Sequence, residues 1–256
     1  MDLKAIQHEE EVWSKLFQNE LQKQEFKKFS AFWWEDYYNE IINFVTSNIL
    51  VNLENKNILE AWSGSWKSSL LIWNYVDKIT LLDISESALK YAKFLSQKLN
   101  IEKNIIYVKG NIFNMDFEDN IFDFTWNIWT IEHYNIEDIK NILNEMIRVT
   151  KNNWYIALWF PNFYSWPIIK AWLNNKLPFL KWYKLDTEIF YTEKEIINLI
   201  NSIESVKIQD LKVNKFWNFM PMWTPKILVK LAKKLEKIFY KNKFLNFVSF
   251  KIIKNG

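Results

Sequence analysis

Short apolar runs alternate with amphipathic stretches between Asn57 and Phe160, and this alternation most limits what the chain can fold into. The apolar runs predict strands at 58–61, 79–83, 105–108, 122–127 and 154–160, and the amphipathic stretches predict helices at 65–75, 87–99 and 136–150. Strands that alternate with helices of this length form βαβ units. We therefore expect the α/β class, with a doubly wound, mostly parallel sheet.

The flanking segments predict further elements of the same domain. Residues 4–50 have helical periodicity, 162–192 form an aromatic-rich insertion, and 206–213 and 247–253 complete a seven-stranded sheet. Ser85 is a plausible N-cap, and Thr192 with Glu195 offers a capping box for a helix over 192–202.

Composition excludes several classes of protein. The chain is 49% hydrophobic and 25% charged, which is typical of a globular protein. It has no Cys, so a disulfide framework and a thiolate metal site are excluded. No apolar run is long enough for a membrane span, and the first residues are acidic where a signal peptide would be basic. We expect a cytoplasmic protein.

Glycine and tryptophan occur in unusual numbers. The chain has 3 Gly and 15 Trp, whereas ordinary glycine usage of ~7% predicts roughly 18 in a chain this long. Arg148 is the only arginine beside many lysines, which suggests an AT-rich genome. Some bacterial lineages read the UGA codon as glycine, so we expect that several glycines are written here as Trp. Misread glycines should lie where φ is positive or where the backbone approaches another group closely.

The loop after the first strand reads E-A-W-S-G-S-W-K, from Glu60 to Lys67. With glycine at positions 62 and 66 it becomes E-x-G-x-G-x-G. A strand that turns sharply into a helix at the carboxyl edge of a sheet is where open α/β sheets bind ligands. Glycine lets the backbone approach the ligand, and a helix N-terminus favours a carboxylate.

This loop resembles the cofactor loop of the class I, S-adenosylmethionine-dependent methyltransferases, of the small-molecule, type 11-like kind. The resemblance continues through ITLLDIS (79–85), YVKGN (107–111), FDFTWNIWTIEHY (122–134) and RVTKNNWYIALWFPN (148–162). It implies one methyltransferase domain over 1–256, with an N-terminal helical cap (1–52), a cofactor-binding core (53–161), and an acceptor cap with the C-terminal strands (162–256). The glycine interpretation is strongest for Trp62, Trp66 and Trp129, and extends to Trp73, Trp154 and Trp166. Trp13, Trp34 and Trp182 are read as genuine.

The resemblance implies a set of residues that bind S-adenosylmethionine. They are Glu60, Trp62, Gly64, Trp66, Asp83, Ile84, Asn111, Ile112 and Asn127. Asp83 would accept both ribose hydroxyls, as acidic residues do in dinucleotide sites; its alternative role is an N-cap of the next helix. Asn111 stands where the family usually has Asp, and its carbonyl can still accept from the adenine amine.

The other members of the set have smaller roles. Glu60 would face the amino group of the cofactor, or else be a cap or surface carboxylate. Ile84 would pack on adenine, and Ile112 would add a backbone contact. Asn127 and position 129 would line the mouth where donor and acceptor meet.

Acceptor chemistry is less constrained. His133, beside Glu132, suits a general base, and a structural role at the start of the next helix is equally open. Phe163, Tyr164, Phe179 and Tyr183 could cover the acceptor or simply pack the insertion onto the sheet. The family needs no metal, and we expect a small-molecule or lipid-like acceptor and no nucleic acid.

A basic amphipathic helix is predicted at about 224–240. From Leu211 to Gly256 there are 11 Lys and one acid, Glu236, a net charge of +10 in a chain of +3. Leu228, Leu231, Leu235 and Ile238 share one face of the helix, and Lys230, Lys233, Lys237 and Lys241 take others. This pattern fits peripheral contact with an anionic membrane, and also a helix that packs its apolar stripe on its own domain, which is the interpretation we favour.

Two other functions remain open. With glycine at position 66, Ala61 to Ser68 fits a relaxed phosphate-loop pattern of a nucleotide hydrolase, although Asp123 begins its strand where a magnesium-binding Asp should end one. If the Trp residues are literal, the chain is instead a non-catalytic, methyltransferase-like binding protein with a blocked pocket.

Overall fold

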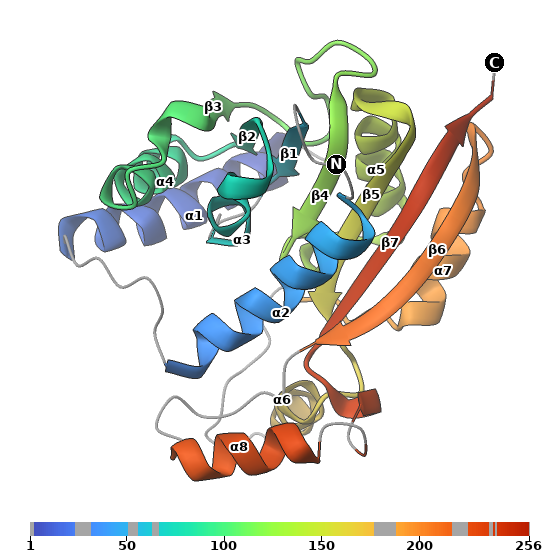
Figure 1. Cartoon of the computed structure of the whole chain (residues 1–256). Helices are drawn as coiled ribbons and strands as arrows, with labels where there is room; N and C mark the ends of the chain where they lie inside the picture. The colour runs from blue at the N-terminus through green and yellow to red at the C-terminus, as the bar shows by residue number, and fades with distance from the viewer. Residues whose placement is uncertain are drawn as a thin grey trace.

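The fold is seen in a computed structural model (Figure 1). The structure describes residues 3–23, 32–50, 56–62, 67–176, 188–216, 225–235, 238 and 240–255. Its centre is a seven-stranded sheet in the order β3-β2-β1-β4-β5-β7-β6. The strands are β1 (Asn57–Ala61), β2 (Lys78–Asp83), β3 (Ile105–Lys109), β4 (Phe122–Ile128), β5 (Thr150–Pro161), β6 (Val206–Phe216) and β7 (Leu245–Lys254).

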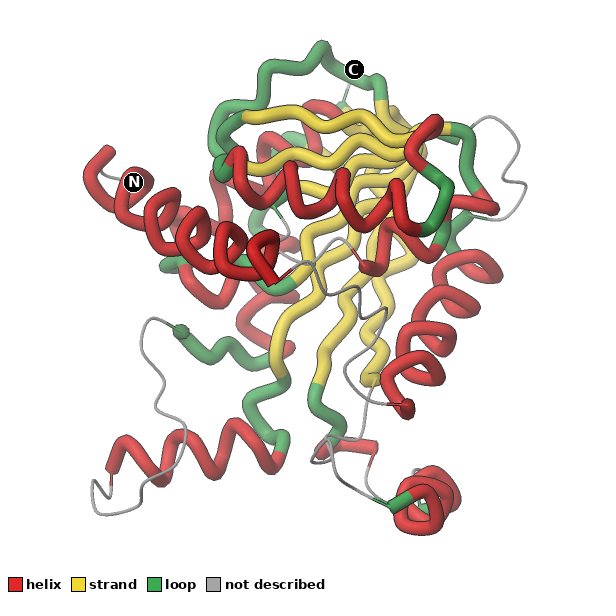
Figure 2. Tube along the Cα trace, turned by 90° about the vertical axis from the view of Figure 1, so that its left-hand side faces the viewer, coloured by secondary structure: helices red, strands yellow, loops and turns green. Residues whose placement is uncertain are grey.

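Helices cover both faces of the sheet, as Figure 2 shows edge-on. The α-helices are α1 (Leu3–Lys23), α2 (Phe32–Asn48), α3 (Lys67–Leu71), α4 (Glu86–Lys98), α5 (Ile136–Val149), α6 (Trp166–Lys176), α7 (Glu193–Asn201) and α8 (Lys226–Lys234). Buried residues of α1 to α4 form one hydrophobic cluster with the sheet. Buried residues of α5 and α7 form a second cluster on the opposite face. The sheet is therefore doubly wound, as predicted.

Strand direction places the functional edge. The first five strands pair in parallel, whereas β7 runs antiparallel between β5 and β6. The carboxyl ends of β1, β2, β4 and β5 therefore meet at one edge of the sheet. In Figures 1 and 2 this edge faces the end of the molecule where α6 and α8 lie.

The predicted elements are confirmed, with two helices shorter than expected. Ser85 caps α4, and Thr192 forms the predicted capping box of α7 with Glu195. The helix predicted at 65–75 ends at Leu71 and gives way to a 3-10 turn, Trp73–Tyr75. That turn brings the chain back so that the N–H groups just before and at the start of β2 reach the carbonyl of Lys56. The basic helix predicted at 224–240 is described as helix only over Lys226–Lys234.

Arg148 holds the loop between β3 and β4 against α5. Its guanidinium donates to the carbonyls of Met115 and Phe117, both at 2.7 Å. It also donates to Glu145, on the same helix, at 2.8 Å and to Asp119 at 2.8 Å. Because this loop begins at the carboxyl end of β3, the arginine fixes a segment that belongs to the ligand-binding edge.

We expect Arg148→Ala to lower the free energy of unfolding by about 2 kcal/mol, because two backbone carbonyls and two carboxylates lose a charged donor. Arg148→Lys should recover less than half of this loss, since an ammonium lacks the planar fork of the guanidinium. Urea denaturation of the three proteins measures the difference. A lysine variant as stable as the parent would show that charge alone, and not the fork, holds the loop.

Candidate functional site

Hydrogen bonds join the turns that follow β1 and β4. Asn127 Nδ2 donates to the carbonyl of Ala61 at 2.5 Å, and Thr130 Oγ1 donates to the carbonyl of Trp62. The backbone N–H of Trp62 donates to Leu82 at 2.8 Å, and that of Trp129 donates to Trp159 at 3.1 Å. The ends of β1, β2, β4 and β5 are therefore fixed relative to one another at the carboxyl edge.

Trp62 and Trp129 lie in the left-handed region of backbone space. Their φ angles are 58° and 57°. The other described residues with positive φ are Asn100, Asn120, Asn153 and Asp210, which are the residue types that tolerate this region. A bulky aromatic residue there is an outlier, whereas glycine adopts the conformation freely. Two positions at which the sequence most strongly predicts glycine thus have the backbone geometry that glycine favours.

The same criterion does not support three of the other positions. Trp73 begins a 3-10 turn, Trp154 lies within β5, and Trp166 begins α6, and none of them has a positive φ. The left-handed residue beside Trp154 is Asn153, and both lie inside β5, so the turn expected to enter the strand at 154 is not there, while glycine at 154 stays a prediction. Trp66 and Gly64 lie outside the described residues.

Two buried carboxylates lie at the carboxyl ends of the first two strands, Glu60 one residue before the end of β1 and Asp83 at the end of β2. Glu60 is fully buried in β1, which excludes the surface role, and Asp83 at the end of β2 is 3% exposed. Asp83 Oδ1 accepts from the backbone N–H of Ser85 at 2.7 Å, and it is Ser85 that caps α4. Burial raises the pKa of Asp83 to about 7, and the nearby charge of Glu60 adds to this rise. An acid kept here at such a cost is typical of a functional site.

The loop after β3 folds around its own polar groups. Asn111 Oδ1 accepts from the backbone N–H of Phe113 at 2.9 Å, and the N–H of Gly110 donates to the carbonyl of Asp83 at 3.0 Å. Ile84 and Ile112 are buried beside this loop. The structure therefore places the loop that contains Asn111 against the end of β2. The side-chain carbonyl of Asn111 already accepts one hydrogen bond, from Phe113. Contact with an adenine ring stays a prediction for all three side chains.

The region around the end of β4, here called the mouth of the site, contains the side-chain oxygen of Asn127 and the aromatic rings around Trp129. Asn127 is fully buried, and its Oδ1 has no hydrogen-bond partner in the described part of the chain. The ring of Trp129 lies 6.4 Å from that of Trp159 and 5.3 Å from that of Phe244, between centroids. Phe244 precedes β7, far along the chain, and no local sequence signal points to it.

The four aromatic residues predicted to cover the acceptor are only partly described. The rings of the neighbouring residues Phe163 and Tyr164 contact each other edge to face. Phe179 and Tyr183 lie outside the described residues.

The first helix also contributes to the site, which the sequence did not predict. Ser14 and Ser85 share a hydrogen bond of 2.9 Å between their hydroxyls, and Glu10 pairs with Lys109 at 2.8 Å. Trp13 meets His133 edge to face, with 6.1 Å between ring centroids. His133 is half-buried in a 3-10 turn that precedes the true N-cap of α5, Asn135. The helix therefore extends from the end of β2 to the turn that carries His133.

Comparison with known proteins agrees with this arrangement. Residues 59–158 match the family model described as a methyltransferase domain. Over 103 residues the chain is 34% identical to the ubiquinone/menaquinone biosynthesis C-methyltransferase UbiE of Rickettsia prowazekii (strain Madrid E), which covers 38% of this chain and 41% of the relative. The corresponding protein of Rickettsia typhi (strain ATCC VR-144 / Wilmington) is 33% identical over the same shares. These matches identify residues 59–158 as a methyltransferase domain of class I. The chain spans less than half the length of these curated relatives.

Solved structures show the same fold. Magnesium protoporphyrin IX methyltransferase from Synechocystis PCC 6803 superposes with a TM-score of 0.62 at 10% identity, covering 94% of this chain and 96% of that one. A methyltransferase from Aquifex aeolicus described as SAM-dependent superposes with a TM-score of 0.54 at 16% identity, covering 83% and 89%. At these identities the likeness concerns the fold alone.

The described residues of this domain fit S-adenosylmethionine, the cofactor of the class I methyltransferases. Asp83 and Asn127 offer buried acceptor oxygens, and the ligand has hydroxyl and amino donors. The phosphate-loop alternative is not favoured, because Asp123 accepts from Lys151 at 2.9 Å and from the N–H of Asn57 at 2.9 Å. That carboxylate therefore lies at the amino end of its strand, away from the ligand-binding edge.

We expect the stability of the ligand-free protein to depend on the ionisation of Asp83. Its pKa is raised from 3.8 to about 7 in the fold, so the folded state holds a proton that the unfolded state loses. The resulting stabilisation is present below about pH 4 and is lost as pH rises towards 7 and beyond, a change of roughly 4 kcal/mol in the free energy of unfolding.

Asp83→Asn removes this titration and is the matched control. Urea denaturation from acid to neutral pH should show the parent losing stability relative to the Asp83→Asn variant as pH rises. Parallel pH profiles for the two proteins would contradict the raised pKa.

Proposed function

We propose that this methyltransferase transfers the methyl group of S-adenosylmethionine to a small, lipid-like acceptor at the carboxyl edge of its sheet. The observation that supports this most is the pair of joined, left-handed turns at Trp62 and Trp129, between the buried acids and the aromatic mouth. A backbone bent in this way presents main chain to a ligand if the two residues carry no side chain.

In this proposal the cofactor lies across the ends of β1, β2 and β4. Asp83 accepts from the ribose hydroxyls, and Glu60 and Asn127 face the charged amino acid end. Ile84, Asn111 and Ile112 contact the adenine, and the turn from 62 to 66, including Gly64, approaches the methionine part. Support comes from the burial of these acids and from the acceptor oxygen of Asn127 that no described donor uses.

The aromatic mouth supports an acceptor with a conjugated ring. The curated relatives above are named for ubiquinone and menaquinone biosynthesis, and quinones are flat, conjugated molecules. The rings of Trp159 and Phe244 both pack against the ring of Trp129, and Trp159 is otherwise buried. If position 129 is glycine, as proposed below, both rings would be uncovered at the mouth, and offset stacking on such rings is favourable. We therefore propose an apolar, ring-bearing acceptor.

The chain would act mainly by positioning and by excluding water. The bound sulfonium supplies the methyl group, which is transferred in line to the acceptor. The protein would hold both partners at the sheet edge, which removes much of the entropic barrier. The helix α1, which contacts Ser85, Lys109 and His133, would help to exclude water from the site. His133, beside the mouth, would take the proton that an acceptor carbon or oxygen loses.

We further propose that positions 62 and 129 are glycine in the functional protein. The support is their φ of 58° and 57°, which strains a non-glycine residue by about 1–3 kcal/mol. Reading codons 62 and 129 of the gene gives the first test, since UGA fits the proposal and UGG contradicts it.

Calorimetry with S-adenosylmethionine tests the site. We expect the Trp62→Gly/Trp129→Gly protein to bind at least tenfold more tightly than the chain as written, or about 1.4 kcal/mol, because the turns are relieved and cleared. Trp154→Gly is the matched control, because Trp154 lies in a strand without positive φ, and it should give no gain. If neither form binds, the cofactor site is wrong; if ATP binds instead, the phosphate-loop function gains support.

The role proposed for His133 has its own test. Once an acceptor has been identified, the kinetics of His133→Ala test this role. If the imidazole takes the proton, the substitution should lower kcat by about 100-fold or more and leave KM nearly unchanged. His133→Gln keeps a polar side chain beside Trp13 and serves as the control. A loss below tenfold, restored by glutamine, would show that His133 only packs against α1.

A further inference from the structure

The helix α8 exposes its apolar face to solvent. Ile227 is 75% exposed, Leu228 49% and Leu231 50%, and Leu235 and Ile238 continue the exposed series beyond the helix. Val229, by contrast, is buried. The interpretation that this stripe packs on its own domain is therefore wrong, because the opposite side of the helix faces the protein.

Helical geometry places the exposed apolar side chains of α8 on one side of the helix. At 3.6 residues per turn, positions 227, 228 and 231 share one sector, and Val229 lies on the far side. Exposed apolar side chains scattered singly are ordinary on a protein surface, but a contiguous row on one helix marks an interaction site. On α6, Trp172 and Leu173 are exposed as well.

Lysines border this apolar face. Lys226, Lys230 and Lys234 are exposed and follow one another at intervals of four residues, so they form a neighbouring row on the helix. The segment from Leu211 to Gly256 carries +10 while the whole chain carries +3, so the rest has a net charge of −7. The positive charge is thus concentrated in the part of the chain that contains α8.

The charge and the residue types favour an anionic lipid surface over a protein partner. The core of a protein interface is depleted in charged residues, whereas here a row of three exposed lysines lies directly beside the apolar face. Lysine side chains can extend from an apolar helix towards phosphate groups while their methylene stems stay on apolar surface. A helix with apolar residues on one face and lysines beside them binds in the plane of a membrane surface.

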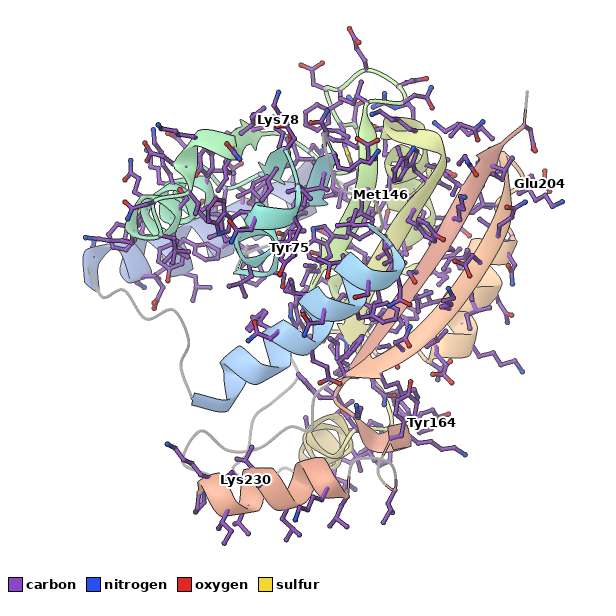
Figure 3. All side chains as sticks on the ribbon, in the orientation of Figure 1. Tyr75, Lys78, Met146, Tyr164, Glu204 and Lys230 are labelled. Atoms are coloured by element: carbon purple, nitrogen blue, oxygen red, sulfur yellow. The ribbon has the colours of Figure 1, made fainter. Side chains whose placement is uncertain are left out.

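The exposed face of α8 lies at the same end of the molecule as the candidate site. In Figures 1 and 2, α6 and α8 both lie beyond the carboxyl edge of the sheet. Figure 3 shows Lys230 on α8 at this end, while Lys78 and Glu204 lie towards the opposite end. None of the described helices is long and apolar enough to cross a membrane.

We propose that α8 docks the protein on the surface of an anionic phospholipid membrane. Ile227, Leu228 and Leu231 enter the boundary between headgroups and acyl chains, and the row of lysines contacts the phosphates. The carboxyl edge of the sheet then faces the membrane. If the proposed function holds, a lipid-like acceptor reaches the site from the membrane without crossing water.

Flotation with vesicles tests the docking directly, without any methyl transfer. The full chain should bind vesicles of phosphatidylcholine with roughly 30 mol % phosphatidylglycerol, and bind pure phosphatidylcholine at least tenfold more weakly. Raised salt should weaken the binding, because it screens charges at the surface.

Paired variants separate the apolar and the charged contributions. Ile227→Ser/Leu231→Ser should weaken binding by roughly tenfold or more, since two side chains no longer leave water. Lys230→Glu/Lys234→Glu should weaken it by about 25-fold or more, at about fivefold for each lysine lost. The controls are Ile106→Ser, on the edge strand β3, and Lys78→Glu/Lys103→Glu, all at exposed positions away from α8; these should bind as the parent does.

Three outcomes would overturn the proposal. One is no binding to anionic vesicles, and another is equal loss in the control variants. The third is concentration-dependent dimerisation that Leu231→Ser abolishes while vesicle binding stays absent, which would assign the face to a second copy of the chain. Vesicle binding by a protein that methylates no acceptor would instead count against the proposed function and leave the docking intact.

Discussion

The hydrogen bonds between Asn127 and Ala61 and between Thr130 and Trp62 are the constraint on which the site depends. Side chains from the end of β4 and the turn after it hold the main chain at the end of β1 and in its turn. Each of the two joined turns contains a left-handed residue, at positions 62 and 129. The shape of the carboxyl edge is therefore set by the ends of β1 and β4 together. The loops that follow the other strands pack around these two ends.

The carboxyl edge of the sheet contains groups that lower the stability of the folded state, and interactions elsewhere in the fold offset this loss. Asp83 is buried with a pKa near neutrality, and a buried carboxylate without a ligand disfavours the folded state once it ionises. Away from the edge, local interactions are well satisfied, as in the capping box of α7 and the hydrogen bonds of Arg148. This distribution is expected of an enzyme, in which strain and buried charge concentrate where ligands bind.

The sequence predicted those features that depend on local patterns. Alternating apolar runs predicted all seven strands, because period and length distinguish strand from helix, and Ser85 and Thr192 act as caps through contacts within a few residues. It did not predict that α1 reaches the site or that Phe244 stacks on Trp129, because such contacts join distant segments. Nor could periodicity decide the orientation of α8, since an amphipathic helix has the same pattern whether its apolar face meets a core or solvent.

The packing of α1 has a consequence for the exchange of ligands. This helix is attached near the end of β2 by the hydroxyls of Ser14 and Ser85, by an ion pair with Lys109, and by the ring of Trp13 on His133. In the proposed arrangement, a spent nucleotide would lie across that strand end and would leave only when these contacts open. Its residence time would then be governed by the detachment of α1 as much as by its own contacts, so the slowest event of a catalytic cycle could be the departure of product.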